Sequence, residues 1–154
     1  MKTFKKYLNE DFFPPLLNKQ SEEEQIEAVQ KLGSYIRHIN NPSEKVQRIA
    51  MENFPKGIMW IKNPSEEAQL ISVGSDIWNV YYIKKPTLKV QQFVFSKAPT
   101  IVADGSFNMS KEFQEWLIDK NPSNIFKIPK EKLNPELAEK YKYLLSMNKV
   151  GILK

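Results

Sequence analysis

The fold is decided by residues 36 to 94, where one pattern occurs three times: IRHINNPSEKVQRIA (36–50), IMWIKNPSEEAQLIS (58–72) and VYYIKKPTLKVQQFV (80–94). The prolines of the three copies, Pro42, Pro64 and Pro86, are 22 residues apart. A fixed period of this length is typical of repeat proteins, in which each copy packs on the next. Positions in the repeat are numbered here from that proline, which is position 1.

Position 6 of the repeat is always glutamine. Further copies are found 22 residues before and 23 residues after these three, so that the series reads Gln25, Gln47, Gln69, Gln91 and Gln114. A buried amide must be satisfied, so we expect each glutamine to bond the backbone of the adjoining repeat and fix the stacking register. The alternative is a polar row that faces a partner.

The apolar positions predict helices. Positions 5, 8 and 9, such as Val46, Ile49 and Ala50, have the i, i+3, i+4 spacing of one helical face. Positions 10, 17 and 20 are apolar in every copy except at Gly105, and they complete the expected core. Their residues are Val29, Met51, Val73, Phe95, Ile118; Ile36, Ile58, Val80, Val102, Ile125; and Ile39, Ile61, Ile83, Ile128.

Each repeat should contain two helices. Asn41 and Asn63 precede a proline and suit the N-cap of the first helix, with Glu44 and Glu66 at its third residue, and Ser21 with Glu24 forms a capping box. The first helix should stop where four helix-ending residues fall, and a second helix of about two turns should carry positions 15 to 20. The four are Gly33, Pro55, Pro99 and Pro122.

The predicted architecture is all-α, with five to six short helical hairpins stacked as a small, HEAT-like α-solenoid. A leucine-rich repeat of similar length is the competing fold, but its strand needs alternating L-x-L spacing that this pattern lacks. We expect a single repeat domain over 1–154. It comprises an N-terminal cap (1–20), five repeats (20–130) and a basic C-terminal cap or degenerate sixth repeat (131–154).

The composition is that of an ordered chain, with 41% hydrophobic and 12% aromatic residues. There is no cysteine, which excludes disulfides, thiolate nucleophiles and cysteine-based zinc sites and suits a reducing compartment. No signal-peptide pattern or apolar run long enough to span a membrane occurs, so we expect a cytoplasmic protein, in the host cytoplasm if its origin is viral.

Positive charge is concentrated near the C-terminus. The net charge is +5, and residues 120–154 hold eight lysines against three glutamates. A basic region of this kind attracts polyanions such as nucleic acid or acidic protein surfaces. A solvated, lysine-rich surface without a ligand is the alternative.

No catalytic or cofactor site is expected. His38 is the only histidine, so a multi-histidine metal site is excluded, and its position 19 is Trp60 and Tyr82 in other copies, which favours a surface role. Carboxylates such as Glu22 and Glu66 fall in the first turn of a helix, where they stabilise its dipole. We therefore predict a non-enzyme with no cofactor and no metal.

Positions 18, 19 and 21 carry the candidate partner-binding residues, which combine aromatic and basic side chains. Second helices of solenoids often line the binding surface, and Trp, Tyr and Arg most often carry interface energy. The alternative is that Trp60, Tyr81 and Tyr82 complete the hydrophobic core. The candidates are Arg37, His38, Trp60, Lys62, Tyr81, Tyr82, Lys84, Phe126 and Lys127.

The NPSEEAQL and NPSEKVQR segments, each preceded by I-x-x-I, resemble the tandem "NPSEEVQ" helical repeats of phage, giant-virus and bacterial proteins, a family of largely unknown function. The resemblance is strong over Ile36 to Val94, whereas Lys85, Leu88 and Phe113 depart from the motif. It implies the repeat architecture and a viral origin, and it identifies no activity.

The functional hypothesis is a protein-binding module that presents the aromatic and basic surface to an acidic or amphipathic protein. A viral accessory or anti-defence protein that binds and blocks a host factor would have this form. The alternative is a nucleic-acid binder that uses a basic surface and the C-terminus. Membranes are not among the expected partners.

Overall fold

The computed structural model describes residues 14–103 and 107–149. Within these ranges every regular element is a helix, either α or 3-10, and no strand is present, so the predicted all-α stack of short helical hairpins is confirmed over the leucine-rich alternative. The chain divides into two compact units, residues 1–83 and 84–154, which are described separately. The N-terminal cap predicted for 1–20 is described only from Pro14 onward.

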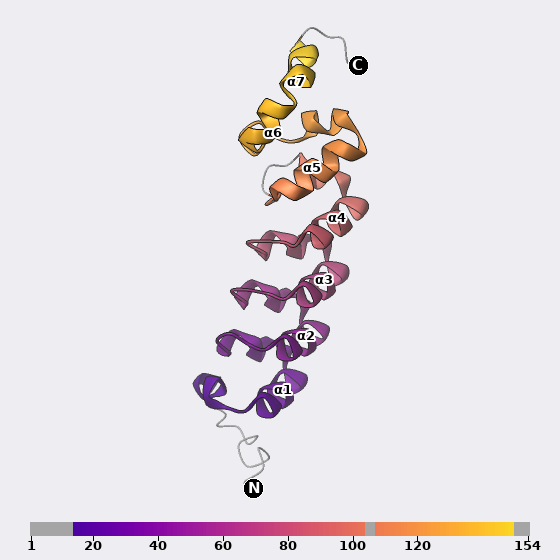
Figure 1. Cartoon of the computed structure of the whole chain (residues 1–154). Helices are drawn as coiled ribbons and strands as arrows, with labels where there is room; N and C mark the ends of the chain where they lie inside the picture. The colour runs from indigo at the N-terminus through magenta and orange to yellow at the C-terminus, as the bar shows by residue number, and fades with distance from the viewer. Residues whose placement is uncertain (1–13, 104–106, 150–154) are drawn as a thin grey trace. The chain divides into compact units, whose positions relative to one another are not determined.

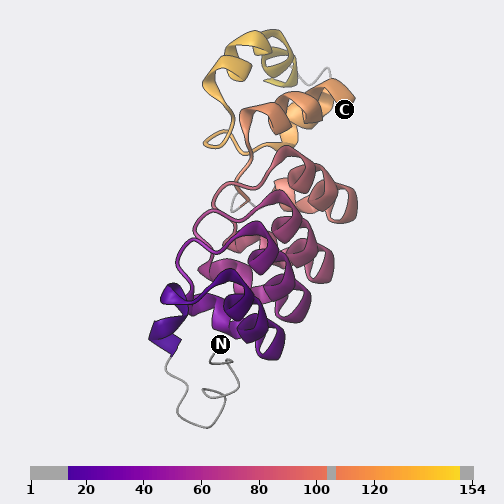
Figure 2. The same ribbon diagram turned by 60° about the horizontal axis from the view of Figure 1, so that its bottom comes forward.

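The first unit has two layers (Figures 1 and 2). The α-helices pack side by side in one layer, α1 on α2 and α2 on α3, and the 3-10 helices form the other, with η3 on η4 and η4 on η5. Each hairpin consists of one α-helix and the 3-10 helix that follows it. The elements are η2 (Pro14–Lys19), α1 (Glu22–Lys31), η3 (Gly33–His38), α2 (Glu44–Asn53), η4 (Pro55–Trp60), α3 (Glu66–Ser75) and η5 (Ile77–Tyr82).

The second unit contains two more hairpins and a different C-terminal end. Its elements are α4 (Leu88–Lys97), η6 (Pro99–Val102), α5 (Lys111–Lys120), η7 (Pro122–Lys127), α6 (Pro135–Lys140) and α7 (Lys142–Lys149). Helix α4 packs on α5, and α7 packs on η7. In the C-terminal segment, expected to be a cap or a degenerate sixth repeat, Asn134 caps α6, and the α-helix α7 follows where the other repeats have a 3-10 helix.

The second element of each hairpin is a 3-10 helix, whereas the sequence predicted only a short second helix of unspecified kind. With about three residues per turn, a 3-10 helix places residues i and i+3 directly above one another. Positions 17 and 20 therefore point to the same side, and Ile58 and Ile61 are both buried. Positions 10, 17 and 20 are buried throughout the described residues except at Phe95, which is partly exposed, and Gly105 lies outside them. Position 8 is less well covered, since Ile71, Phe93 and Trp116 are partly exposed.

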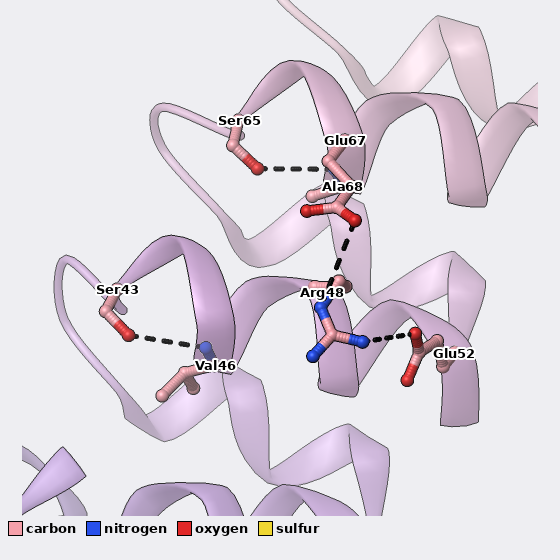
Figure 3. Close-up of polar contacts among 7 residues, drawn as sticks. All are labelled: Ser43, Val46, Arg48, Glu52, Ser65, Glu67 and Ala68. Carbon is pink, nitrogen blue, oxygen red and sulfur yellow. Dashed lines mark hydrogen bonds and ion pairs between the residues drawn. The ribbon is translucent and has the colours of Figure 1, made fainter.

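The helix stops were predicted correctly and most of the starts were not. Gly33, Pro55, Pro99 and Pro122 each begin the 3-10 helix that follows an α-helix. The N-caps, however, are the hydroxyl residues at position 2 rather than the asparagines that precede the proline (Figure 3). Ser65 Oγ accepts from the Ala68 amide at 3.2 Å, and α3 begins at Glu66.

The first N-cap follows the prediction, because Ser21 and Glu24 form the expected capping box. In the second copy the error has a conformational reason. Asn41 has a φ of 51°, in the left-handed region, and so it turns the chain before Pro42 instead of starting a helix. Serine then provides the first side chain that can reach the amide of the third helical residue.

Removal of one cap should have a modest, measurable effect. We expect Ser65→Ala to lower the free energy of unfolding by about 1 kcal/mol, because the Ala68 amide loses its acceptor. Urea denaturation followed by circular dichroism would measure the change. Ser75→Ala, at the exposed last residue of α3, is the control and should change stability by less than about 0.5 kcal/mol. Equal losses in the two variants would contradict the capping role.

Gln47, Gln91 and Gln114 connect successive repeats, as predicted. Gln47 Nε2 donates to the Pro42 carbonyl of its own repeat at 2.9 Å, and its Oε1 accepts from the Ser65 amide of the next repeat at 2.8 Å. In the second unit Gln91 makes the same pair of bonds, to the Pro86 carbonyl and the Ser110 amide. The amides are buried, so these bonds fix the stacking register in a region shielded from water.

Candidate partner-binding surface

Charge is segregated between the two layers of the first unit. Residues 33–43, 55–65 and 77–83, which form the 3-10 helices and the loops after them, contain no Asp or Glu. Among the described residues of this unit, the carboxylates belong to the α-helices, apart from Asp76, whose side chain caps η5. The 3-10 layer instead carries Arg37, Lys56 and Lys62. One layer therefore presents positive charge without opposing carboxylates of its own.

An exposed group of aromatic side chains lies on the same layer. Trp60 is 39% exposed, Tyr82 41% and Tyr81 37%, so these residues are not part of the hydrophobic core, contrary to the alternative considered from the sequence. Trp60 stacks on Phe54 at a centroid distance of 5.7 Å, which holds the indole in place. We call the exposed residues of this layer the η face: Arg37, Lys56, Met59, Trp60, Lys62, Trp78, Tyr81 and Tyr82.

Trp78 and Lys56 are members of the η face that the sequence analysis missed. Trp78 is 53% exposed and stacks on Tyr81 at 5.9 Å, and Lys56 Nζ lies 5.9 Å from the centre of the Tyr82 ring. Both occupy position 15 of the repeat, one 3-10 turn before position 18. The period of three residues would have identified them, because positions 15 and 18 share a side of a 3-10 helix.

A hollow of about 310 Å³ opens beside Trp60. Two cations and two amides line it together with apolar groups, and no carboxylate does. Three of the predicted binding residues, Arg37, Trp60 and Lys62, are thereby brought together. The full lining is Arg37, Ile39, Asn40, Asn41, Pro42, Trp60 and Lys62.

His38 supports this hollow without lining it. Its side chain is partly buried, and Nε2 accepts a hydrogen bond of 2.7 Å from Arg37 Nε. Burial lowers the pKa of His38 below its ordinary value, and the positive charge of Arg37 lowers it further. The neutral imidazole can thus accept from Arg37 and orient the guanidinium.

The remaining candidates belong to the second unit. Lys84 lines a separate hollow of about 390 Å³ with Lys85 and Asn108, and Asn108 Nδ2 donates to the Lys84 carbonyl at 3.2 Å. Phe126 is partly buried and Lys127 is exposed, both on η7. The structure therefore divides the predicted surface: six candidates lie in the first unit and three in the second.

Among the residues that the structure describes, no three His, Asp or Glu side chains come close enough together to hold a metal ion. Within the same residues, no helix is both long and apolar enough to cross a membrane. Glu22 and Glu66 lie in the first turns of α1 and α3, as their predicted dipole role requires.

The chain matches no protein-family model, and neither a curated protein nor a solved structure matches it significantly.

Proposed function

We propose that the chain is a protein-binding module and that the η face binds an acidic segment of its partner that also carries apolar or aromatic side chains. The observation that carries the proposal is the exposure of Trp60, Trp78, Tyr81 and Tyr82 on a layer without carboxylates. Large exposed apolar clusters are uncommon on soluble monomers and mark interaction sites. Trp and Tyr also lose little conformational entropy when they are covered.

The rigidity of the layer supports the same proposal. Three of the four exposed rings are held in stacks, Trp60 on Phe54 and Trp78 on Tyr81, so a partner would meet groups that are already ordered. With an origin among viral proteins, as the repeat resemblance implies, such a module would act in the host cytoplasm by covering the binding surface of a host factor.

Selection of peptides tests the proposal while the partner is still unidentified. The chain would be immobilised and used to enrich a phage library of random peptides, and enriched peptides would be synthesised and titrated by fluorescence polarisation. We expect enrichment of sequences that combine Asp or Glu with aromatic or aliphatic residues. No enrichment above a bare surface, or enrichment of basic sequences, would overturn the proposal.

The variant Trp60→Ala/Tyr82→Ala should bind the selected peptides at least about 30-fold more weakly, because a buried aromatic anchor contributes about 2 kcal/mol or more. Its melting temperature should fall only slightly, since both side chains are exposed. Tyr143→Ala is the matched control, because Tyr143 is a tyrosine on α7 in the second unit and is 72% exposed. Unchanged peptide binding by the double variant would show that the η face is not the binding site.

A nucleic-acid partner is the second candidate, favoured by the charge of the second unit. Residues 84–154 contain 13 lysines against seven acidic residues. Binding to phosphates releases counterions, so affinity for labelled single-stranded or duplex DNA or RNA should fall steeply between about 50 and 200 mM salt. Polarisation titrations at these two concentrations would decide this candidate, and the absence of binding at low salt would eliminate it.

A further inference from the structure

We propose that the hollow beside Trp60 is a carboxylate-binding subsite of the η face. An Asp or Glu side chain of the partner would lie between the Arg37 guanidinium and the Lys62 ammonium, with its methylene groups against the Trp60 indole. The inference rests on the proposed protein-binding function and specifies which chemical group of the partner is recognised.

The lining supplies the groups that a carboxylate requires. Arg37 and Lys62 are both exposed and border the hollow from successive repeats, and the side chains of Asn40 and Asn41 add uncharged hydrogen-bond donors. Hydrogen bonds from a cation to a carboxylate are stronger than bonds between neutral groups. Ile39, Pro42 and Trp60 provide apolar contacts for the stem of an acidic side chain.

The two cations differ from Arg48 of the α layer in how they are paired. Arg48, on α2, is neutralised by Glu52 at 2.7 Å and lies 3.9 Å from Glu67 of the next repeat (Figure 3). Neither Arg37 nor Lys62 forms an ion pair with any residue that the structure describes, and Arg37 instead bonds the neutral His38 through Nε. The terminal nitrogens of the Arg37 guanidinium can therefore bond a carboxylate of the partner.

The charge of the first unit favours a short acidic peptide over a nucleic acid. Between residues 14 and 83 there are nine carboxylates and seven cations, so this unit has no excess positive charge with which to attract a polyanion. Nucleic-acid binders commonly neutralise about six to ten phosphates, whereas the η face offers Arg37, Lys56 and Lys62. A peptide that carries one or two carboxylates beside apolar side chains matches both the few cations and the rings.

The position of Trp60 predicts the order of groups in the partner. Trp60 borders the hollow, and its helix η4 packs on η5, which carries Tyr81 and Tyr82. A partner that places a carboxylate in the hollow would therefore direct its neighbouring residue over the aromatic side chains. The recognised element is an acidic residue adjacent to an aromatic or aliphatic one.

Titration with a small blocked amino acid tests the subsite directly. In a heteronuclear NMR experiment on the ¹⁵N-labelled full chain, the indole N–H of Trp60 would be assigned by its loss in Trp60→Phe. Acetyl-glutamate amide should shift this signal saturably at low ionic strength, whereas the isosteric, uncharged acetyl-glutamine amide should not. The absence of a saturable shift, or equal shifts with both compounds, would overturn the inference.

Two double variants with the same change in charge locate the effect. Arg37→Gln/Lys62→Gln should abolish the shift, and it should weaken binding of acidic selected peptides about tenfold or more. Lys45→Gln/Arg48→Gln, on α2, should retain both properties. A uniform loss in the two variants would show that net charge is responsible and would overturn the subsite.

The outcomes also separate this inference from the proposed function. If peptide binding is lost in Trp60→Ala/Tyr82→Ala but retained in Arg37→Gln/Lys62→Gln, the η face binds proteins and the carboxylate subsite is wrong. Inorganic phosphate serves as a third titrant. If it binds more tightly than acetyl-glutamate amide and depends on the same two cations, the ligand is a phosphate group and the carboxylate assignment is overturned.

Discussion

Replacement of Gln47 by leucine is expected to lower the free energy of unfolding by about 3 kcal/mol, although the two side chains are similar in size. The side-chain amide of Gln47 bonds both the Pro42 carbonyl and the Ser65 amide. Leucine would leave these two backbone groups without that partner, and each buried unsatisfied group costs about 1–3 kcal/mol. Urea denaturation of the variant and the parent chain would measure the difference.

The control for this variant is Gln30→Leu on α1, because Gln30 is exposed and lies outside the repeated lattice. It should change stability by less than about 0.5 kcal/mol.

Gln47→Glu adds a second test. Only the protonated acid can donate to the Pro42 carbonyl, and burial raises the pKa of a carboxyl group, so the folded variant should bind a proton more readily than the unfolded one. Its stability should therefore fall as the pH rises from about 4 to 7, whereas a pH-independent loss would contradict the bridging role.

The second large effect is expected from Gly33→Ala. A Cβ atom at Gly33 would lie 2.6 Å from the Cβ of Phe54 and 2.9 Å from its backbone nitrogen, both in the next repeat. The obstacle includes backbone at the end of α2, so a side-chain rotation cannot relieve it, and the two hairpins must move apart. We expect a loss of about 3 kcal/mol, which thermal or urea denaturation would detect.

Gly74→Ala is the control, and its effect on stability should have the opposite sign. Gly74 lies in α3, and nothing is within 4 Å of the position that its Cβ would occupy. Gly74→Ala should raise stability by up to about 1 kcal/mol, because alanine restricts the unfolded chain and suits a helix. If Gly33→Ala were as stable as the parent chain, the close packing of the first two hairpins would be refuted.

The sequence predicted the repeat well because its period depends on a few strict requirements. Position 6 must carry both a donor and an acceptor to reach two backbone groups, and Gln47 and Gln91 meet that requirement in different units. Positions 17 and 20 must be apolar because each faces its neighbours in the stack, as Ile58 and Ile61 do.

Details that depend on choices between similar local structures were not predictable. The sequence Asn-Pro-Ser contains two residues able to cap a helix, and the serine is the cap at both Ser43 and Ser65, although of the two preceding asparagines Asn41 alone has a left-handed conformation. Two buried asparagines were also missed. Asn79 Nδ2 donates to the Ser72 carbonyl at 3.1 Å and Asn124 Nδ2 to the Leu117 carbonyl at 2.8 Å, which closes the end of α3 and α5. Both occupy position 16, and that shared position was the available signal.

The sequence predicted which kinds of side chain form the candidate site, and it identified only some of the individual residues. Arg37, Trp60 and Lys62 share a hollow, because η3, η4 and the loop after η4 lie side by side in successive repeats. Their exposure could not be read from the sequence, because an aromatic residue beside a core position fits a buried face equally well. Trp78 and Lys56 were missed because the second helix was not identified as a 3-10 helix.

The glutamine bridge has a further consequence for how such a chain can vary. Because each bridge ends on a backbone amide, it depends on no particular side chain in the following repeat. The bridges join residues 18, 19 and 20 positions apart, in Gln47 to Ser65, Gln91 to Ser110 and Gln114 to Asn134. The connecting loops can therefore change in length and sequence while the bridges persist, and loop residues such as Asn40 and Asn108 line the two hollows. The stack and its connecting loops are thus separable, so the residues that line the hollows can change without redesign of the stack.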